Sequence, residues 1–452
     1  MKQFRILAPT AILGYGFPVG SFQRGLELEP HLIAVDGGST DPGPYYLGSG
    51  KPFTDRAAVK RDLRYMLVEG VRRGIPVIIG TAGGSGAAPH LAWCRDIVTE
   101  LAHEEGLTFR LGIIPADVAT ETVVEAFRQN RLTPLEGVPG IDETAIRACT
   151  HIVAQMGTEP FAAALDLGCQ VILAGRAYDP AVFAAMPIMQ GYPAGLAIHM
   201  GKILECAAIA AEPGSGADAA VGILREDRFE LVPLNPERRF TRRSTAAHSL
   251  YEKSDPLRLP GPGGLLNLTA CRFEASGDGR ITVQGSVYEP AAKKVKLEGA
   301  QPLGFRTVCI AGVRDPIMID GIQSILSELR QRVDGMLAEA GIAGKVWFHL
   351  YGTNGVMGSR EPARSPPAHE LGIVIEAVAD TQAQADTICS MTRSTLLHYG
   401  YPGRIATAGN LAFPFSPSDL STGACYGFVL CHLMDYREDM FPVETVEIGG
   451  SR

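Results

Sequence analysis

In the first half of the chain, short uninterrupted apolar runs alternate with segments of helical periodicity. Residues 75–80 (IPVIIG) and 169–175 (CQVILAG) are typical of strands that are buried on both faces. Residues 54–73 and 89–105 carry apolar residues at helical spacing, and Gly74 follows the first of these segments. Strands that alternate with helices in this way form parallel sheets. The sequence therefore predicts an α/β fold with a Rossmann-like parallel sheet.

The character of the sequence changes after a Pro/Gly/Ala-rich segment at residues 210–220 (AAEPGSGADAA). Beyond it, residues 281–297 are typical of antiparallel strands, and a long helical pattern covers residues 317–340. We therefore expect two domains. The first is an N-terminal α/β domain with Gly-rich ligand loops over residues 1–215, and the second is a C-terminal α+β domain over residues 216–452.

Charge and cysteine content narrow the protein class. The net charge of -8 weighs against a nucleic-acid-binding protein, which is normally basic. The nine cysteines form no CxxC pair and no Cys/His cluster with zinc-ligand spacing, so we expect reduced, buried thiols. Residues 1–17 lack the apolar core of a signal peptide, and no run of about 20 apolar residues suits a membrane span. We expect a cytoplasmic protein without a nucleic-acid or membrane partner.

A Gly-rich loop at residues 80–86 (GTAGGSG) joins a predicted strand to a predicted helix. Gly83 and Gly84 would let backbone N–H groups approach an anion near the helix N-terminus, and Thr81 and Ser85 add hydroxyl groups. The loop matches neither the dinucleotide fingerprint nor the Walker A pattern. It is either a substrate-binding loop or a tight turn between a strand and a helix.

A second Gly-rich loop, DGGSTDPGPYYLG, follows the strand expected at residues 31–36. Asp36 and Asp41 could act as a general base or bind a hard cation, and Ser39 and Thr40 lie between them. Asp and Ser also satisfy backbone groups of loops, which is the structural alternative. We expect catalytic aspartates and substrate contacts from Ser39 and Thr40. We expect no metal, because no third ligand is visible.

Arg176 follows the predicted strand 169–175 in the segment GRAYDP. Its guanidinium could hold a carboxylate or phosphate through two parallel hydrogen bonds. Asp179 could contact the substrate too, or it could be the internal ion-pair partner of Arg176. Both residues are candidates for substrate binding.

The segment 246–256 (AAHSLYEKSDP) holds a candidate proton-transfer pair. If the segment is helical, His248 and Glu252 lie at positions i and i+4 on one face. The carboxylate would orient the imidazole and raise its pKa, which suits proton transfer near neutral pH. Tyr251, next to Glu252, is a candidate substrate contact. The alternative is an ordinary surface pair.

Missing motifs restrict the chemistry. The sequence has no GxSxG elbow, HExxH motif, kinase motif set or P-loop. Nucleophilic hydrolysis, zinc chemistry, kinase chemistry and nucleotide-dependent ligation therefore lose support. Proton-transfer chemistry needs only an acid, a base and a group that holds an anion. We expect no cofactor and a small anionic substrate.

Four long segments together carry a family resemblance: VDGGSTDPGPYYLGSG, GTAGGSGAAPHL, LAGRAYDPAVFA and AAHSLYEKSDPLRLPGPGG. They resemble the acyclic terpene utilisation AtuA-like family, and the resemblance extends over residues 5–435. Membership would imply catabolism of branched terpenoid acids, other carboxylic acids or their CoA esters. Many relatives carry, or are encoded beside, a small C-terminal partner domain. This chain ends at Arg452, so we expect any such partner to be a separate small subunit.

Residues and resemblance together predict a catabolic enzyme of branched carboxylic acids or acyl-CoA esters. A hydratase/dehydratase or an isomerase without a redox cofactor fits best. The alternative is a non-catalytic subunit that binds an acyl ligand within a catabolic complex. The apolar run AAMPIMQGYPAGLAI, without a membrane span, also leads us to expect a homo-oligomer.

Overall fold

The computed structural model describes residues 2–363 and 368–449. Contacts between Cα atoms divide the chain into two compact units. Unit 1 comprises Met1–Gln301 and Phe428–Arg452, and unit 2 comprises Pro302–Gly427. The fold of each unit is described separately below.

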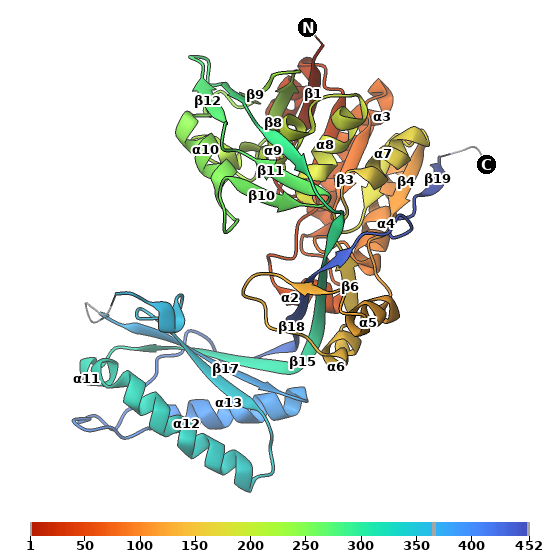
Figure 1. Ribbon diagram of the computed structural model, residues 1–452. Coiled ribbons are helices and arrows are strands. Elements are labelled where there is room, and N and C mark those ends of the chain that lie inside the picture. Colours follow the sequence, from red (N-terminus) through yellow and green to blue (C-terminus); the bar gives the residue numbers. More distant parts are fainter. Residues whose placement is uncertain (1, 364–367, 450–452) are drawn as a thin grey trace. The chain divides into compact units, whose positions relative to one another are not determined.

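A ten-stranded mixed sheet forms the centre of unit 1, in the order β12-β13-β9-β8-β1-β2-β3-β7-β4-β19 (Figure 1). Its parallel strands are β1 (Phe4–Ala8), β2 (Leu32–Asp36), β3 (Val77–Gly80), β7 (Val171–Ala174) and β4 (Phe109–Ile114). The flanking antiparallel strands are β8 (Ala220–Leu224), β9 (Arg228–Pro233), β13 (Ile281–Gln284), β12 (Arg272–Ala275) and β19 (Glu444–Ile448). The predicted Rossmann-like parallel sheet and the α/β class are confirmed. Because β8 pairs with β1, the segments on both sides of the expected boundary at residue 215 belong to one sheet.

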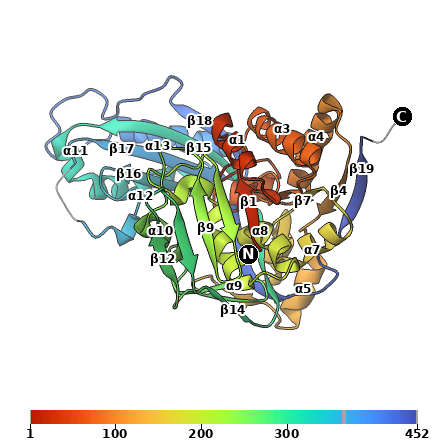
Figure 2. The same cartoon turned by 90° about the horizontal axis from the view of Figure 1, so that it is seen from above.

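Helices cover both faces of the parallel strands (Figure 2). One layer contains α1 (Val19–Glu27), α3 (Arg56–Arg73) and α4 (Ala88–Glu105). The other layer contains α5 (Thr120–Arg128), α7 (Glu159–Asp166), α8 (Asp179–Met189) and α9 (Ala194–Leu204). Successive strand residues point to opposite faces, so Leu7 packs in the first layer and Ile6 in the second. Asp55 caps α3, and Gly74, with φ of 68°, ends it, as the sequence pattern predicts.

Smaller elements complete unit 1. A three-stranded antiparallel sheet packs against α9, and α10 (Arg242–Leu250) packs against the same helix. The strands of this sheet are β10 (Arg258–Gly261), β11 (Gly264–Asn267) and β14 (Val287–Pro290). The remaining elements are α2 (Pro44–Ser49), α6 (Glu143–Ala148), η1 (Ala207–Ala210), β5 (Thr133–Pro134) and β6 (His151–Ala154). In unit 1, β6 pairs with the first part of β15 (Lys294–Val313), and β5 pairs with the last part of β18 (Asp419–Asp435).

Unit 2 has the succession β-α-β-β-α-β of a ferredoxin-like fold. It consists of the second part of β15, α11 (Pro316–Asp320), α12 (Ile322–Glu339), β16 (Lys345–Tyr351), η2 (Gly358–Arg360), β17 (Leu371–Ala379), α13 (Gln382–Leu397) and the first part of β18. Its strands follow the order β16-β17-β15-β18. Leu329 of α12 and Ile388 of α13 pack with Ile375 of β17, so both long helices cover the same face of this sheet. The α+β organisation expected for the C-terminal part is present here.

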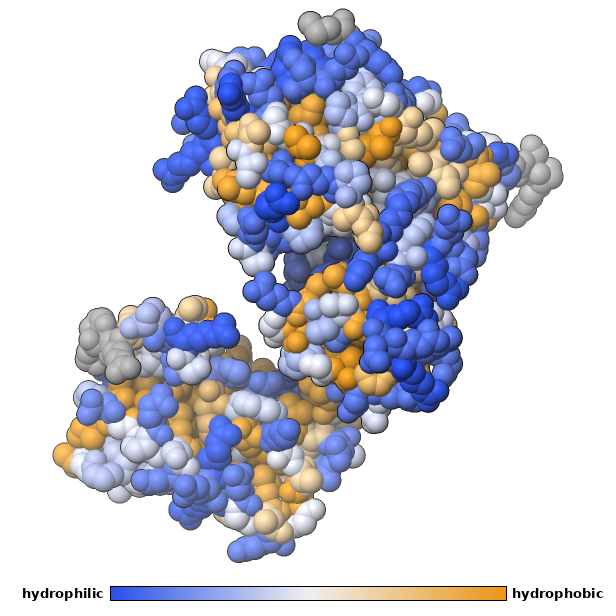
Figure 3. Space-filling model, viewed as in Figure 1, coloured by the Kyte–Doolittle hydropathy of each residue, from blue (hydrophilic) through white to orange (hydrophobic). Residues whose placement is uncertain are grey.

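Hydrophobic residues reach the surface between hydrophilic ones, as the face in Figure 3 shows. The apolar run AAMPIMQGYPAGLAI, expected to form a surface patch, belongs to α8 and α9, and most of its side chains lie in the core of unit 1. The run therefore does not support the expected homo-oligomer, because the packing of two helices explains its apolar character. The oligomer itself stays a prediction. Among the described residues, no helix has both the length and the apolar character needed to cross a membrane.

Candidate functional site

Loops that the sequence singled out meet at the carboxyl ends of the parallel strands in unit 1. The N–H of Gly37, after β2, donates to the carbonyl of Gly80, at the end of β3, at 2.7 Å. The N–H of Arg176, after β7, donates to the carbonyl of Gly86 at 3.2 Å. Ligands of open α/β sheets bind at this edge, so the loops form the first candidate site.

Packing explains the two central glycines of the loop at residues 80–86. Gly83 and Gly84 have positive φ values of 66° and 102°. A Cβ atom at Gly84 would lie 2.6 Å from the Cβ of Phe53, and one at Gly83 would lie 2.8 Å from the Cβ of His90. The loop therefore makes a tight turn between strand and helix. Anion binding by the loop stays a prediction.

Arg176 occupies the centre of a buried charge cluster. Its Nε donates to Oε2 of Glu298 at 2.7 Å, and its Nη1 donates to Oδ1 of Asp179 at 2.8 Å. Oε1 of Glu298 accepts from Lys296 at 2.6 Å and from the hydroxyl of Thr40 at 2.9 Å. The guanidinium of Arg176 is thus mostly occupied by partners within the protein. This arrangement corresponds to the alternative of an internal ion pair, which the sequence left open. The sequence did not reveal Glu298, because a single glutamate in the distant strand β15 carries no motif.

The charges of this cluster have opposite effects on neighbouring carboxyl groups. Burial disfavours ionised Glu298, but Arg176 and Lys296 outweigh burial and lower its pKa to about 2. Burial, with repulsion from Asp179, raises the pKa of Asp36 well above its ordinary value. Burial also raises the pKa of Asp179, despite its pairing with Arg176. The same region therefore holds one ionised carboxylate and two carboxyl groups that retain protons more readily than usual.

A small polar pocket of about 60 Å³ opens beside the cluster. It is lined by Ser39, Asp41, Gln155, Arg176, Tyr178, Asp179, Pro180, Lys202, Glu205, Glu252, Lys253 and Lys296. Five predicted site residues are among them: Ser39, Asp41, Arg176, Asp179 and Glu252. Three lysines join them that no sequence motif identified, because isolated lysines are typical of any solvated surface.

Four other predicted residues of the two Gly-rich loops are buried and do not line this pocket. Asp36 and Thr40 are buried, and one carboxylate oxygen of Asp36 has no hydrogen-bond partner among the described residues. Thr81 is fully buried, and its hydroxyl accepts from the N–H of Ala177 at 3.3 Å. Ser85 is also fully buried. None of these four side chains lines the polar pocket.

An apolar pocket of about 250 Å³ shares Tyr178 with the polar pocket. Its other lining residues come mainly from α8, α9 and the small sheet: Gly157, Thr158, Glu159, Ala181, Ile188, Ala194, Ile198, Leu259, Gly261, Pro262, Gly263, Leu266, Tyr288, Pro290 and Lys293. The turn LPGPGG joins β10 to β11 and forms one wall of this pocket. The segment 246–264, which carries part of the family resemblance, thus lines this pocket with its C-terminal end.

His248 and Glu252 do not form the predicted helical pair. Helix α10 ends at Leu250, and Glu252 lies beyond it with φ of 82°, where its carboxylate accepts from Lys202 at 2.7 Å. Burial and the charge of Lys202 lower the pKa of His248 to about 4. The expected rise in this pKa is wrong, because desolvation of the imidazolium outweighs its attraction to Glu252. The half-exposed ring of Tyr251 lies 4.9 Å from the Lys202 ammonium.

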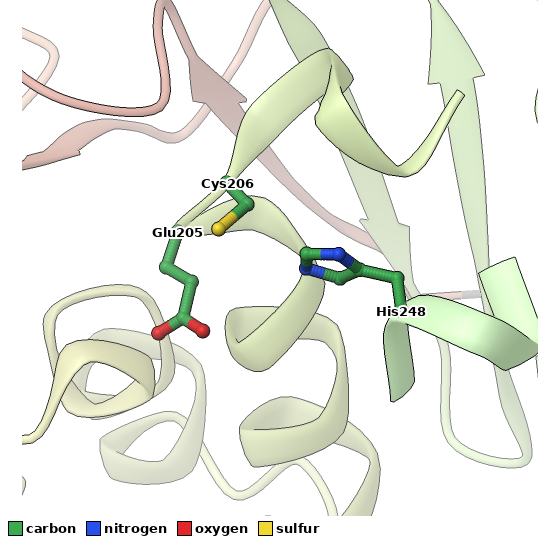
Figure 4. Close-up of side chains that lie close together, drawn as sticks. All are labelled: Glu205, Cys206 and His248. Carbon is green, nitrogen blue, oxygen red and sulfur yellow. The ribbon is translucent and has the colours of Figure 1, made fainter. Parts of the chain in front are cut away.

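His248 instead faces Glu205 and Cys206 (Figure 4). Glu205 and Cys206 follow the last turn of α9, and His248 comes from α10. One ligand atom from each of the three side chains lies within 4.8 Å of the others. No spacing motif connects these residues in the sequence, because only the packing of α10 on α9 brings them together.

A comparison with models of known protein families identifies the family of this chain. The model of the acyclic terpene utilisation family protein AtuA matches residues 55–216 and 235–414. These ranges include Arg176, the three lysines of the polar pocket and the turn that lines the apolar pocket. No curated protein sequence and no solved structure matches the chain significantly. The family match covers most of the sequence, so the chain belongs to the acyclic terpene utilisation family, and this membership implies a role in the use of acyclic terpenes.

Proposed function

We propose that unit 1 binds a branched carboxylic acid or its CoA ester and moves protons on it, in a hydration, dehydration or isomerisation. One observation carries the proposal: the polar pocket and the apolar pocket share Tyr178. A ligand with a charged head and a branched hydrocarbon chain needs two such neighbouring environments. The family's link to acyclic terpenes agrees with such a ligand, because acids of this class carry branched apolar chains.

Lysines supply positive charge for an anionic head group. Lys202 and Lys296 line the polar pocket, but they already pair with Glu252 at 2.7 Å and with Glu298 at 2.6 Å. Lys253 lines the same pocket and forms no ion pair among the residues that the structure describes. Lys253 is therefore the cation best placed to neutralise a substrate carboxylate.

Asp179 is the proton donor best placed for the chemistry. It lines the polar pocket with 21% of its side chain exposed, whereas Asp36 is buried and does not line the pocket. In a dehydration, a base removes the proton from the carbon next to the carbonyl, and its electron pair forms the double bond. The C–O bond breaks, and the proton of Asp179 leaves with the hydroxyl as water. Asp41, in the same pocket, would accept the carbon-bound proton.

The proposal is tested by offering the purified chain branched 3-hydroxy and 2,3-unsaturated acids, both free and as CoA esters. We expect turnover of at least one of them. Asp179→Asn should lower kcat by about 10²–10⁴-fold with a much smaller change in KM. Asp227→Asn, at an exposed site, is the matched control and should leave kcat unchanged. Ligand binding without turnover, even after addition of a small partner subunit, would support the non-catalytic alternative instead.

A further inference from the structure

Three side chains of different chemistry meet where α10 packs against the end of α9 (Figure 4). They are the carboxylate of Glu205, the thiol of Cys206 and the imidazole of His248. Glu205 and His248 are each only 8% exposed, and Cys206 is partly buried. The cluster therefore lies inside the fold of unit 1 and is not a group of solvated surface residues.

Two atoms of the cluster lack a partner. Oε2 of Glu205 and Nε2 of His248 are buried without a hydrogen-bond partner among the described residues. The imidazole hydrogen-bonds to the backbone carbonyl of Lys202, and because Nε2 is unpartnered, Nδ1 is the donor. The lone pair of Nε2 is therefore free, and the ring points toward Cys206 and Glu205 in Figure 4. Metal-binding histidines typically have such a second hydrogen bond, because it fixes the tautomer and the ring orientation.

We propose that Glu205, Cys206 and His248 bind a divalent transition-metal ion, with zinc as the best match. Proteins bind zinc through thiolate, imidazole and carboxylate groups at about 2.0–2.3 Å. Ligand atoms of a tetrahedral zinc ion lie about 3.5 Å apart, so side-chain movements of about 1 Å would close this set around the ion. The sulfur ligand favours zinc over magnesium and calcium, which prefer oxygen ligands. Three protein ligands leave a fourth position for water or substrate.

One lysine lies beside the cluster, and a neighbouring carboxylate offsets its charge. The Nζ of Lys202 lies 3.8 Å from Oε1 of Glu205 and would repel the ion. Glu252 pairs with this ammonium at 2.7 Å and offsets its charge. Glu205 also lines the polar pocket, so a bound ion would lie at the wall of that pocket. The proposed metal site does not depend on which substrate unit 1 binds.

Cobalt, a spectroscopic substitute for zinc, tests the site in the full chain after treatment with a chelator. We expect one equivalent of Co²⁺, a thiolate-to-cobalt charge-transfer band in the near ultraviolet and the visible bands of a four-coordinate ion. Cys206→Ser should remove the charge-transfer band. Glu205→Gln and His248→Gln should each lower the zinc affinity by at least about 10²-fold. Cys431→Ser, at another partly buried cysteine, is the matched control and should change neither result.

Absence of saturable Co²⁺ and Zn²⁺ binding by the wild-type chain, or binding without the charge-transfer band, would overturn the proposal. A band that persists in folded Cys206→Ser would also overturn it, because another thiol would then be the ligand. Far-UV circular dichroism checks the fold of each variant. If a variant does not fold, the cobalt absorption spectrum of the wild-type chain decides whether a thiolate binds the metal. Since no substrate is used, failure of the proposed function would not affect the result.

Discussion

At the scale of single residues, Glu298 connects two cations that line the polar pocket. Its side chain is 2% exposed and binds Arg176, Lys296 and Thr40. Removal of one member of a buried ion pair leaves its partner uncompensated in a medium of low dielectric constant. Because the same guanidinium also holds Asp179, the geometry of the proposed proton donor depends on Glu298.

Glu298→Gln should therefore destabilise the protein markedly. We expect the free energy of unfolding to fall by about 3–5 kcal/mol, because the Arg176 guanidinium would lose its buried counter-charge. Glu289→Gln, which removes the exposed ion pair with Arg258, is the control and should cost less than about 1 kcal/mol. Urea unfolding curves measure both values. Equal losses in the two variants would contradict the role of Glu298.

Acid should weaken the same interaction. The pKa of folded Glu298 is about 2, below its ordinary value of 4.5, so ionised Glu298 stabilises the fold fully above about pH 4.5. This contribution, about 3 kcal/mol, should be lost as the pH falls from about 4.5 toward 2. Urea unfolding of the wild type and of Glu298→Gln across this range measures it. Parallel pH dependence in the two proteins would show that Glu298 titrates normally.

Sequence reasoning found part of this residue network. It identified Arg176, Asp179 and Asp36, because these residues follow predicted strands in Gly-rich loops. It missed Glu298 and the pocket lysines, which carry no local pattern. It also missed Cys206 as a partner of His248, because helix packing creates that neighbourhood.

At the scale of elements, α9 connects the two pockets and the cluster of Glu205, Cys206 and His248. The first residue of this helix, Ala194, lines the apolar pocket, Lys202 lines the polar pocket, and Glu205 at its C-terminal end belongs to both the polar pocket and the cluster. The small sheet covers the same helix. One helix would thus set the positions of the proposed head group, hydrocarbon chain and ion.

Ala194→Phe should fill the apolar pocket from its wall. Because Ala194 is only partly buried, the larger ring should occupy the hollow without disturbing the core. We expect KM to rise for acids with long branched chains and to change little for short ones. Ala338→Phe, on the exposed side of α12, is the control. Equal KM changes for long and short acids, measured by steady-state kinetics, would exclude this pocket as the chain-binding site.

Sequence periodicity predicted elements better than it predicted their ends. The helix expected at residues 89–105 is α4, and the apolar run at residues 75–80 contains β3. Caps and apolar periodicity are local signals, so they appear in the sequence. Helix α10, in contrast, stops before Glu252, whose pairing with Lys202 is a tertiary contact that no local pattern encodes.

At the scale of the whole molecule, one face of the unit 2 sheet carries exposed apolar side chains. The helices α12 and α13 cover the opposite face of this sheet. Ile310 and Trp347 are 38% and 39% exposed, and both pair with β17 positions on the other face. The same face also carries the ion pair of Arg306 with Glu376. Exposed apolar side chains on a sheet face, with charged residues beside them, are typical of protein contacts.

We expect the chain to form at least a dimer through this face, because pairing would bury Ile310 and Trp347. Light scattering at micromolar concentration should give the mass of two chains or more. Trp347→Glu should reduce it to the mass of one chain. Val356→Glu, at a position that is 84% exposed outside the strands, should not change it. A wild-type mass of one chain would contradict this expectation.

Deuterium exchange tests most directly whether the two neighbouring pockets of unit 1 support proton transfer. Branched 3-hydroxy acids and their CoA esters are incubated with the wild-type chain in D₂O and followed by proton NMR. We expect deuterium at the carbon next to the carbonyl, at a rate that Asp179→Asn lowers by about 10²–10⁴-fold. If acids bind to unit 1 but none of them exchanges this proton, the proposed proton-transfer function is contradicted.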